Sequence, residues 1–356
     1  MRYYCSAFVN TSIKKHTKQA ASLTMIVAAL ISVAILIAPT GTRANDSVAA
    51  LGAGGIELLK SEHIRILEEV LEIFPQQVRV RYRFLNESDQ DIATKVAFPL
   101  PPYAGDPSSN VPINYPSRIF ATFKVSVNSR PVVTGSERKA LLDGRDITDQ
   151  LRELGLSDKE IFFDVPDKGT RDLWLKLEQF IPRVGHLWDI SQIIFWDVTF
   201  TAGKETVVEH EYTPATGSGF ALVGNGENLK GDIAKFWGSF TGKHDRENED
   251  CLDETTKRAI ENRVKIAVTK GAESVEVHYQ KIEYILGTGR NWKGSIGEFK
   301  LRLVKEKPDQ FVSVCFPGKP EKVSPTIYEF YQKDFVPQDT LTVYFYRSNQ
   351  WPKYTN

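Results

Sequence analysis

The stretch from Val78 to Phe84 constrains the fold more than any other part of the chain. Apolar and cationic side chains alternate there without a break, in the order VRVRYRF. Successive side chains of a β-strand point to opposite faces, so the pattern predicts a strand with one apolar face and one arginine face, Arg79, Arg81 and Arg83. The arginine face could bind an anionic ligand or pair with acids on a neighbouring strand. We expect the pairing, because Glu68, Glu69 and Glu72 lie one strand earlier.

Similar alternation recurs and predicts a mainly β protein of the β-sandwich type with a few helices. Further strands are expected at residues 92–103, 120–127, 173–181, 193–201, 206–212, 274–286, 297–304, 310–315, 325–331 and 340–346. The strands at 193–201 and 206–212 should form a hairpin across the sequence AGKE. Short helices are predicted after Asp146, which can cap the first, and at the capping-box sequence Ser157 to Glu160; a longer helix is expected from Asp253 to Lys270.

The chain is expected to contain a signal peptide and two β-rich domains. Residues 1–44 form the signal peptide, 45–216 a β-sandwich domain with a short helical insertion, and 217–356 a second β-rich domain with one helix. The boundary is placed where a glycine-rich stretch, 217–242, begins.

The amino-terminal residues have the order of a secretory signal peptide. Lysines at 14, 15 and 18 precede an apolar run at 23–38, and small residues at 42 and 44 follow it. Because that run is shorter than the roughly 20 residues that span a bilayer, we expect cleavage before Asn45 and a periplasmic or secreted protein. The alternative is an uncleaved amino-terminal anchor, which would be the only membrane contact.

Charge and cysteine content fit an exported protein. Cleavage leaves 40 basic and 45 acidic side chains, whereas a nucleic-acid-binding protein usually has a basic excess, so nucleic acid is disfavoured as a partner. Cys5 is removed with the signal, and we expect Cys251 and Cys315 to form a disulfide. Two buried thiols too far apart to react are the alternative.

Nucleotide-binding motifs fail on inspection. The sequence LGTGRNWKG, 286–294, leads into another strand instead of a helix amino terminus, so we predict a turn in which Trp292 closes the core. The sequences GNGENLKG, 224–231, and AGKET, 202–206, lack the helix start and the hydroxyl residue of a phosphate loop. No nucleotide or other cofactor is expected.

Protease and metal motifs fail as well. His210-Glu211 begins a zinc-protease motif, but Pro214 stands where the second histidine is needed, so we expect His210 to be a half-buried structural residue. The mature histidines are dispersed, at 63, 186, 210, 244 and 278. The acidic sequence at 244–254 has oxygen ligands for calcium but lacks the glycine of an EF-hand loop; an exposed loop is expected, and no metal site is predicted. No serine or cysteine nucleophile motif is found, and a carboxylate pair assembled by folding stays possible.

Three separated segments resemble an exported bacterial family, domain of unknown function 4424. They are the mature amino terminus (NDSVAALGAGGIELLKSEHIRILEEVLEI), the segment VRVRYRFLNESDQDIATKVAFPLPPY and the segment YILGTGRNWKGSIGEFKLRL; Cys251 and Cys315 also match that family's positions. Ser295 replaces a usual proline, which should alter one turn. The resemblance implies a Gram-negative, extracytoplasmic setting and no established activity. Residues from about 60 to 216 are similar in motif order to the vault and inter-alpha-trypsin inhibitor type of β-sandwich, without its adhesive metal motif.

The sequence therefore favours a non-catalytic binding or envelope-assembly module whose partner is a protein or another envelope component. Sheet edges and aromatic side chains would supply its binding surface. The candidate aromatics are Trp188, Trp196, Trp237 and Trp292, and most of them are expected in the core. The alternative is a hydrolase of envelope glycans or peptides that uses carboxylates brought together by the fold. No catalytic, cofactor or metal residues are assigned.

Overall fold

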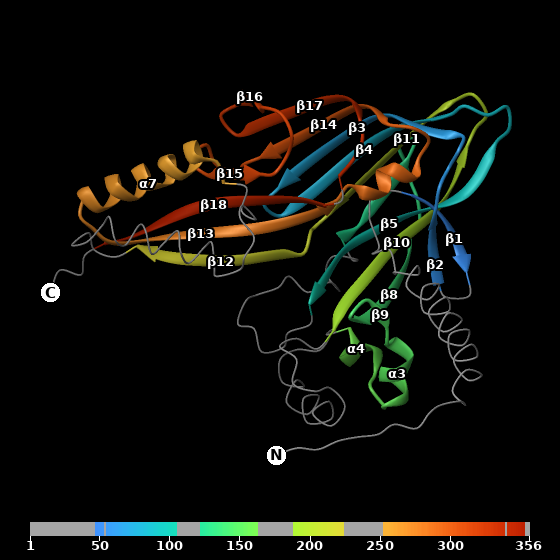
Figure 1. Cartoon of the computed structure of the whole chain (residues 1–356), viewed down its shortest axis with the longest axis horizontal. Helices are drawn as coiled ribbons and strands as arrows, with labels where there is room; N and C mark the ends of the chain where they lie inside the picture. Colours follow the sequence, from blue (N-terminus) through green and yellow to red (C-terminus); the bar gives the residue numbers. More distant parts are fainter. Residues whose placement is uncertain are drawn as a thin grey trace, which may run out of the picture. The chain divides into compact units, whose positions relative to one another are not determined.

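The computed structural model describes residues 47–52, 55–104, 122–162, 188–223, 252–338 and 340–352, all within one compact unit, Thr42–Asn356. The predicted signal peptide, most of the glycine-rich stretch and the strand predicted at 173–181 lie outside these residues. The described chain is mainly β with a few helices, as predicted, and its strands form three sheets (Figure 1).

The six-stranded sheet combines the amino-terminal strands with strands from the middle of the chain. Its spatial order is β2 (Gly55–Leu59), β1 (Ser47–Gly52), β5 (Ile92–Ala104), β10 (Asp189–Phe200), β8 (Gly135–Leu142) and β9 (Arg145–Asp146). All its pairings are antiparallel.

The eight-stranded sheet contains the arginine strand. Its order is β16 (Glu321–Ser324), β17 (Ile327–Phe335), β14 (Ile296–Val304), β3 (Ile64–Phe74), β4 (Gln77–Asn86), β11 (Glu205–Tyr212), β6 (Lys124–Val127) and β7 (Arg130–Pro131). Strands β14 and β3 pair in parallel, which joins the late part of the chain to the early part. Strands from both sides of residue 216 therefore share one sheet, and the domain division placed there stays a prediction.

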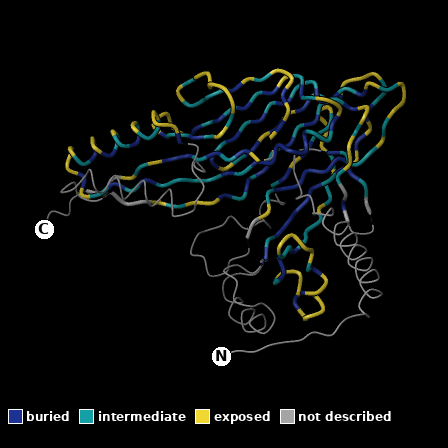
Figure 2. The backbone as a smooth tube through the Cα atoms, viewed as in Figure 1, coloured by how far each residue is buried: buried dark blue, intermediate teal, exposed yellow. Residues whose placement is uncertain are grey.

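A four-stranded sheet and its helix complete the described structure. The order is β12 (Thr216–Val223), β13 (Ala272–Ile285), β18 (Thr340–Pro352) and β15 (Phe311–Val314). The predicted long helix is α7 (Glu254–Thr269), whose side chains Ile260, Val264 and Ala267 are buried against β13 and β15. Figure 2 shows buried and exposed positions alternating along this helix, as expected for an amphipathic helix on a sheet.

Both short helices lie where they were predicted, but the N-cap residue of the first is Ile147, which makes no side-chain cap hydrogen bond, and not Asp146. Asp146 Oδ1 accepts hydrogen bonds from the backbone N and Oγ1 of Thr148 at the start of α3 (Thr148–Glu153). Helix α4 (Asp158–Ile161) begins with the predicted capping box between Ser157 and Glu160.

The main core lies where the apolar faces of the sheets meet. The inward side chains of β4 are 0 to 2% exposed, namely Val78, Val80, Tyr82 and Phe84. They share one cluster with Phe98 and Trp196 of the six-stranded sheet and with Tyr284 of β13. The hydroxyl oxygens of Tyr82 and Tyr284 lie 3.2 Å apart and connect the eight-stranded and four-stranded sheets inside this core. The packing of sheets face to face around this shared core gives the described chain its sandwich-like character.

The predicted hairpin between residues 193–201 and 206–212 is wrong. Strand β10 pairs with β5 and β8, whereas β11 pairs with β4 and β6, so the chain passes from one sheet to the other between them. Gly203 supports this crossing with a φ of 63°. Alternation identified both strands correctly, but it carries no information about which strand each one pairs with.

Candidate functional site: the charged face of the eight-stranded sheet

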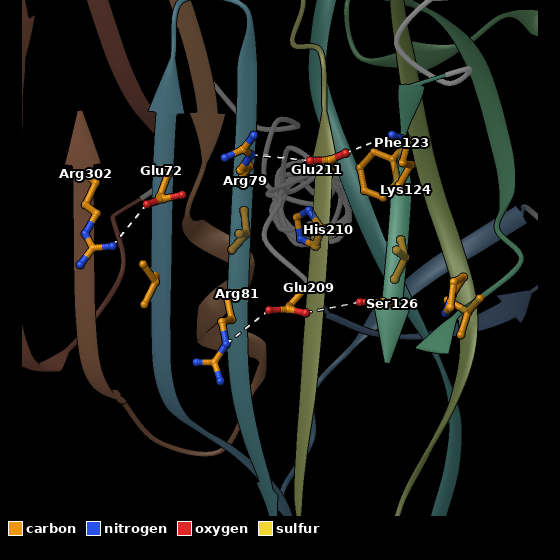
Figure 3. A pocket seen from close by; sticks show the side chains of 15 residues that line it. Glu72, Arg79, Arg81, Phe123, Lys124, Ser126, Glu209, His210, Glu211 and Arg302 are labelled. Carbon is orange, nitrogen blue, oxygen red and sulfur yellow. Dashed lines mark hydrogen bonds and ion pairs between the residues drawn. The ribbon is translucent and has the colours of Figure 1, made fainter. Parts of the chain in front are cut away.

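The outward side of the eight-stranded sheet is covered by charged side chains of alternating sign. Register places six of them in one row across six strands, in the order Glu329, Arg302, Glu72, Arg79, Glu211 and Lys124. Figure 3 shows most of this row, with carboxylate and cationic groups from neighbouring strands pointing toward one another. We call this row, the neighbouring row of Lys300, Val70, Arg81, Glu209 and Ser126, and the adjoining Glu68, Arg83 and Glu205 the charged face.

Short contacts connect the first row. Arg302 lies 2.6 Å from Glu329 and 3.3 Å from Glu72, and Glu211 lies 3.1 Å from Lys124 and 3.6 Å from Arg79. The guanidinium carbon of Arg79 also lies 5.1 Å from the centre of the Phe74 ring, a cation–π contact. Opposite charges on neighbouring strands therefore fix most of these side chains in place.

Glu68 is the centre of the second group of contacts. Its carboxylate lies 2.9 Å from Lys300, 3.4 Å from Arg81 and 3.7 Å from Arg83. The Lys300 hydrogen bond holds the pKa of Glu68 below its ordinary value, and the same bond raises the pKa of Lys300. Both groups therefore stay charged at neutral pH, and the face keeps its donors and acceptors.

The charged face contains a hollow of about 740 Å³. Its lining combines charged and apolar side chains, among them Glu72, Arg81 and Glu209, with Val70 and Val132 beside them. The side chains of Arg79 and Arg81 are 49% and 44% exposed. A guanidinium has several N–H donors in a fixed fork, and the ion pairs described above use only some of them. The hollow can therefore offer donors and acceptors to a ligand while its frame stays held together.

The expected pairing of the arginine stripe is confirmed in part. Glu68 contacts both Arg81 and Arg83, whereas Glu69 points to the opposite side and is 0% exposed. Consecutive residues of a strand face opposite sides, and a bulge in the pairing of β3 with β4, between Ile66 and Glu68, shifts the alternation so that Glu69 and not Glu68 faces the core. Sequence reasoning missed the acids of β11, Glu205, Glu209 and Glu211, and the cations of β14, Lys300 and Arg302. Both sets alternate with apolar residues, but alternation does not predict the neighbouring strand.

His210 is a buried structural residue, as its strand position indicated, and is more buried than expected. It is 3% exposed and stacks on Phe123 with ring centres 5.3 Å apart; Phe98 lies at 4.7 Å. Burial lowers the pKa of His210 to about 3, so the ring is neutral at physiological pH. It borders the hollow from the core side, and the charged side chains beside it in sequence face outward.

The other predicted residues lie away from the charged face. Trp188, Trp196 and Trp292 are core residues that are 0 to 3% exposed, and Trp237 lies outside the described residues. Cys315 follows β15, whereas Cys251 lies outside the described residues, so their disulfide stays a prediction. Leu252, the residue after Cys251, is buried in the cluster beneath α7, and Phe311 of β15 packs against that cluster.

The apparent phosphate loop is a 3₁₀ helix, η2 (Gly287–Asn291), where a turn was expected. Gly289 donates its backbone N–H to Leu286 O. Trp292 closes the core as predicted, with its ring 4.6 Å from that of Phe84. Asn291 donates to Ser47 Oγ at 3.0 Å, so this motif attaches the first described strand to the core.

Two further findings apply to the described residues alone. They hold no group of three or more histidine, cysteine, aspartate or glutamate side chains placed to share a metal ion. None of the helices among them is long and apolar enough to cross a membrane. Most of the acidic sequence at 244–254 lies outside them, but Asp253 caps α7 by accepting from Thr255 N and Thr256 N at 2.8 and 2.9 Å.

A family model matches almost the whole described structure. It is the model of a domain of unknown function, DUF4424, and it covers residues 44–344. The chain belongs to this family. The resemblance that the sequence motifs indicated is thereby confirmed, and DUF4424 as a description names no activity.

Other comparisons add little about this DUF4424 protein. No curated protein matches it. A solved structure from Legionella pneumophila, described as a candidate nutrient binding protein, has 15% identity and a TM-score of 0.38, and the match covers 85% of this chain and 72% of that one. An M1 zinc metallopeptidase from Deinococcus radiodurans has 7% identity and a TM-score of 0.28 over 80% of this chain and 43% of that one. Similarities this low transfer no activity to the DUF4424 chain.

Proposed function

We propose that this DUF4424 protein is an exported, non-catalytic binding module that holds a protein or another envelope component on its charged face. The observation that carries the proposal is the hollow of about 740 Å³, with Arg79 and Arg81 half exposed on its floor. Surface ion pairs contribute little to stability on average, so stability alone gives little reason for so many charges around a hollow. A binding role explains the combination.

The periplasmic or secreted address is part of the proposal. It rests on the basic residues, apolar run and small residues at the start of the chain, and on the even pair of mature cysteines. Intact mass of the protein recovered from the periplasm, with thiol labelling before and after reduction, tests it. We expect a chain that starts at Asn45 and is labelled at Cys251 and Cys315 only after reduction. A full-length mass with freely labelled thiols would contradict both the address and the disulfide.

The motif order of the first half is also part of the proposal. We propose that residues from about 60 to 216 are related to the vault and inter-alpha-trypsin inhibitor type of β-sandwich, on the order of the motifs in the sequence.

A hydrolase is the weaker alternative. Three carboxylates line the hollow, Glu72, Glu209 and Glu211. A glycosidase needs one carboxyl group in apolar surroundings that keep it protonated as the general acid. Arg302 contacts Glu72, Arg81 contacts Glu209, and Lys124 and Arg79 contact Glu211, so the three carboxylates have cationic surroundings instead.

Photo-cross-linking in intact cells tests the binding role. A benzophenone side chain would replace Ser126 on the charged face or, as a control, the exposed Asp197 on β10 of the six-stranded sheet. We expect a reproducible adduct from position 126 and none from position 197. Equal adduct yields from both positions, or none from position 126, would count against a binding role for this face.

A further inference from the structure

The ligand of the charged face must be held by side chains, because the backbone there is already used. Strands β3, β4 and β11 each pair with a strand on both sides, so their N–H and C=O groups lie within the sheet. An extended peptide that adds a strand needs a free sheet edge, and these central strands provide none. The hollow therefore recognises groups that project from its ligand.

The charged face as a whole has no excess of either sign, because its residues named above are six cations and six carboxylates, and the hollow itself is lined by four cations and three carboxylates. Cations and carboxylates alternate along the first row. Every charged group of that row except Arg79 lies within 3.3 Å of an opposite charge on a neighbouring strand. Arg79 itself lies 3.6 Å from Glu211. A polyanion or polycation would gain little attraction from such a surface and would have to displace existing partners. The balance favours a ligand without net charge.

Alternating donors and acceptors point to the chemistry of that neutral ligand. Neighbouring strands are about 4.8 Å apart, so a ligand lying across them would meet an arginine or lysine and then a glutamate at each step. A hydroxyl group both donates and accepts, and can therefore satisfy either neighbour. Val70 of β3, which is half-buried, gives the hollow apolar surface for the C–H face of a sugar ring. We propose that the charged face binds a neutral, hydroxyl-rich glycan whose chain runs across strands β14, β3, β4 and β11.

This inference rests on the proposed binding function and is tested on the purified exported protein. The probe is an array of immobilised neutral, anionic and cationic oligosaccharides, read at low and at high salt. We expect retention by neutral members, with little change in affinity between the two salt concentrations, because no net charge is neutralised. Retention only by charged members, retention that falls steeply with salt, or no retention by any neutral member would overturn the inference.

Matched variants connect any retention to the hollow. Arg81→Gln removes donors and Glu209→Gln removes an acceptor charge, and each should weaken the neutral glycan's affinity roughly tenfold. Arg145→Gln on β9 and Glu153→Gln on α3, both exposed and outside the charged face, should leave it unchanged. Urea unfolding of all four variants confirms that they are folded. Equal affinity of the face variants and the controls would contradict the site.

Failure of the glycan inference can be told apart from failure of the binding role. A protein adduct in the cells from position 126, combined with no retention on neutral glycans, would keep the charged face as a binding site and reject the glycan. Absence of both the adduct and the retention would reject the proposed function itself.

Discussion

Asn86 Nδ2 donates a hydrogen bond to Phe200 O at 2.9 Å, and this bond connects the end of β4 to the end of β10 in the other sheet. The same amide donates to Gln90 O at 2.8 Å, and Asn86 is 0% exposed. Two of the chain crossings between these sheets, from β4 to β5 and from β10 to β11, meet here, because Gly203 N donates to Asn86 O and Asn86 N donates to Lys204 O. Asn86 therefore positions the strands that carry the two sides of the core.

Replacing Asn86 by alanine should be costly. Asn86→Ala removes the side-chain donor of Phe200 O and one of the two donors of Gln90 O, and it removes the Oδ1 acceptor of Ser88 N and Ser88 Oγ. We expect the free energy of unfolding to fall by roughly 2–4 kcal/mol. Gln90→Ala is the control, because the Asn86 amide binds only the backbone oxygen of Gln90; its effect should stay within about 0.5 kcal/mol. Urea unfolding measures both, and similar losses for the two variants would contradict the assigned role.

Gly297 allows β14 to approach the bulge in β3. A Cβ at this position would lie 2.7 Å from the backbone oxygen of Leu67, a contact that only a backbone shift can relieve. Gly297→Ala should therefore lower the free energy of unfolding by roughly 1–3 kcal/mol. At Gly217 a Cβ would have its nearest neighbour at 3.6 Å, so Gly217→Ala should be close to neutral. The reverse order of the two losses would mean that the parallel junction is not tightly packed.

The Glu68 contact with Lys300 should contribute to stability more than the longer and more exposed contact that Glu298 makes with the same lysine. Glu68 is 14% exposed and bonds to Lys300 at 2.9 Å, so Glu68→Gln should cost roughly 1–2 kcal/mol. Glu298, 48% exposed and 3.8 Å from Lys300, gives a matched variant, Glu298→Gln, with an expected loss below about 0.5 kcal/mol. The pKa of Glu68 is lowered from 4.5, so its contribution is present above that pH and is lost as the pH falls. Equal losses in thermal or urea unfolding at pH 7 would contradict this ranking.

Burial of His210 should make the protein sensitive to acid. Its pKa is about 3 when folded, against 6.5 as the ordinary value, so the unfolded chain takes up a proton that the folded chain refuses. Stability is therefore full above about pH 6.5 and falls by about 1.4 kcal/mol for each pH unit down toward 4. Unfolding of the wild type and of His210→Leu between pH 7.5 and 4 measures the difference. Parallel pH profiles would show that His210 does not titrate on unfolding.

Much of the fold could be predicted from local sequence, and the limits have a physical cause. Period-2 alternation identified β4, β10, β11 and β14, and capping residues identified α4 and α7. Pairing could not be predicted, because a two-faced strand fits any neighbour with a matching face. The hairpin expected between β10 and β11 failed for this reason.

In the candidate site, too, local features could be predicted from the sequence and strand pairing could not. The arginines of β4 and the acid Glu68 were recognised from the sequence. The contribution of β11 depends on its pairing with β4, and that of β14 on a parallel pairing with β3, a strand more than 200 residues away. No local pattern encodes either pairing. The bulge that turns Glu69 toward the core arises from the pairing of β3 with β4, so it cannot be predicted from the sequence of β3 alone.

Arginine footprinting in intact cells tests the central claim, occupation of the charged face, most directly. Phenylglyoxal labelling of Arg79 and Arg81 is compared by mass spectrometry between cells and the purified protein, with the exposed Arg145 as internal reference. The account predicts that Arg79 and Arg81 are protected in cells and become labelled after purification, while Arg145 is labelled equally in both. Equal labelling of all three arginines in cells and in the purified protein would contradict it.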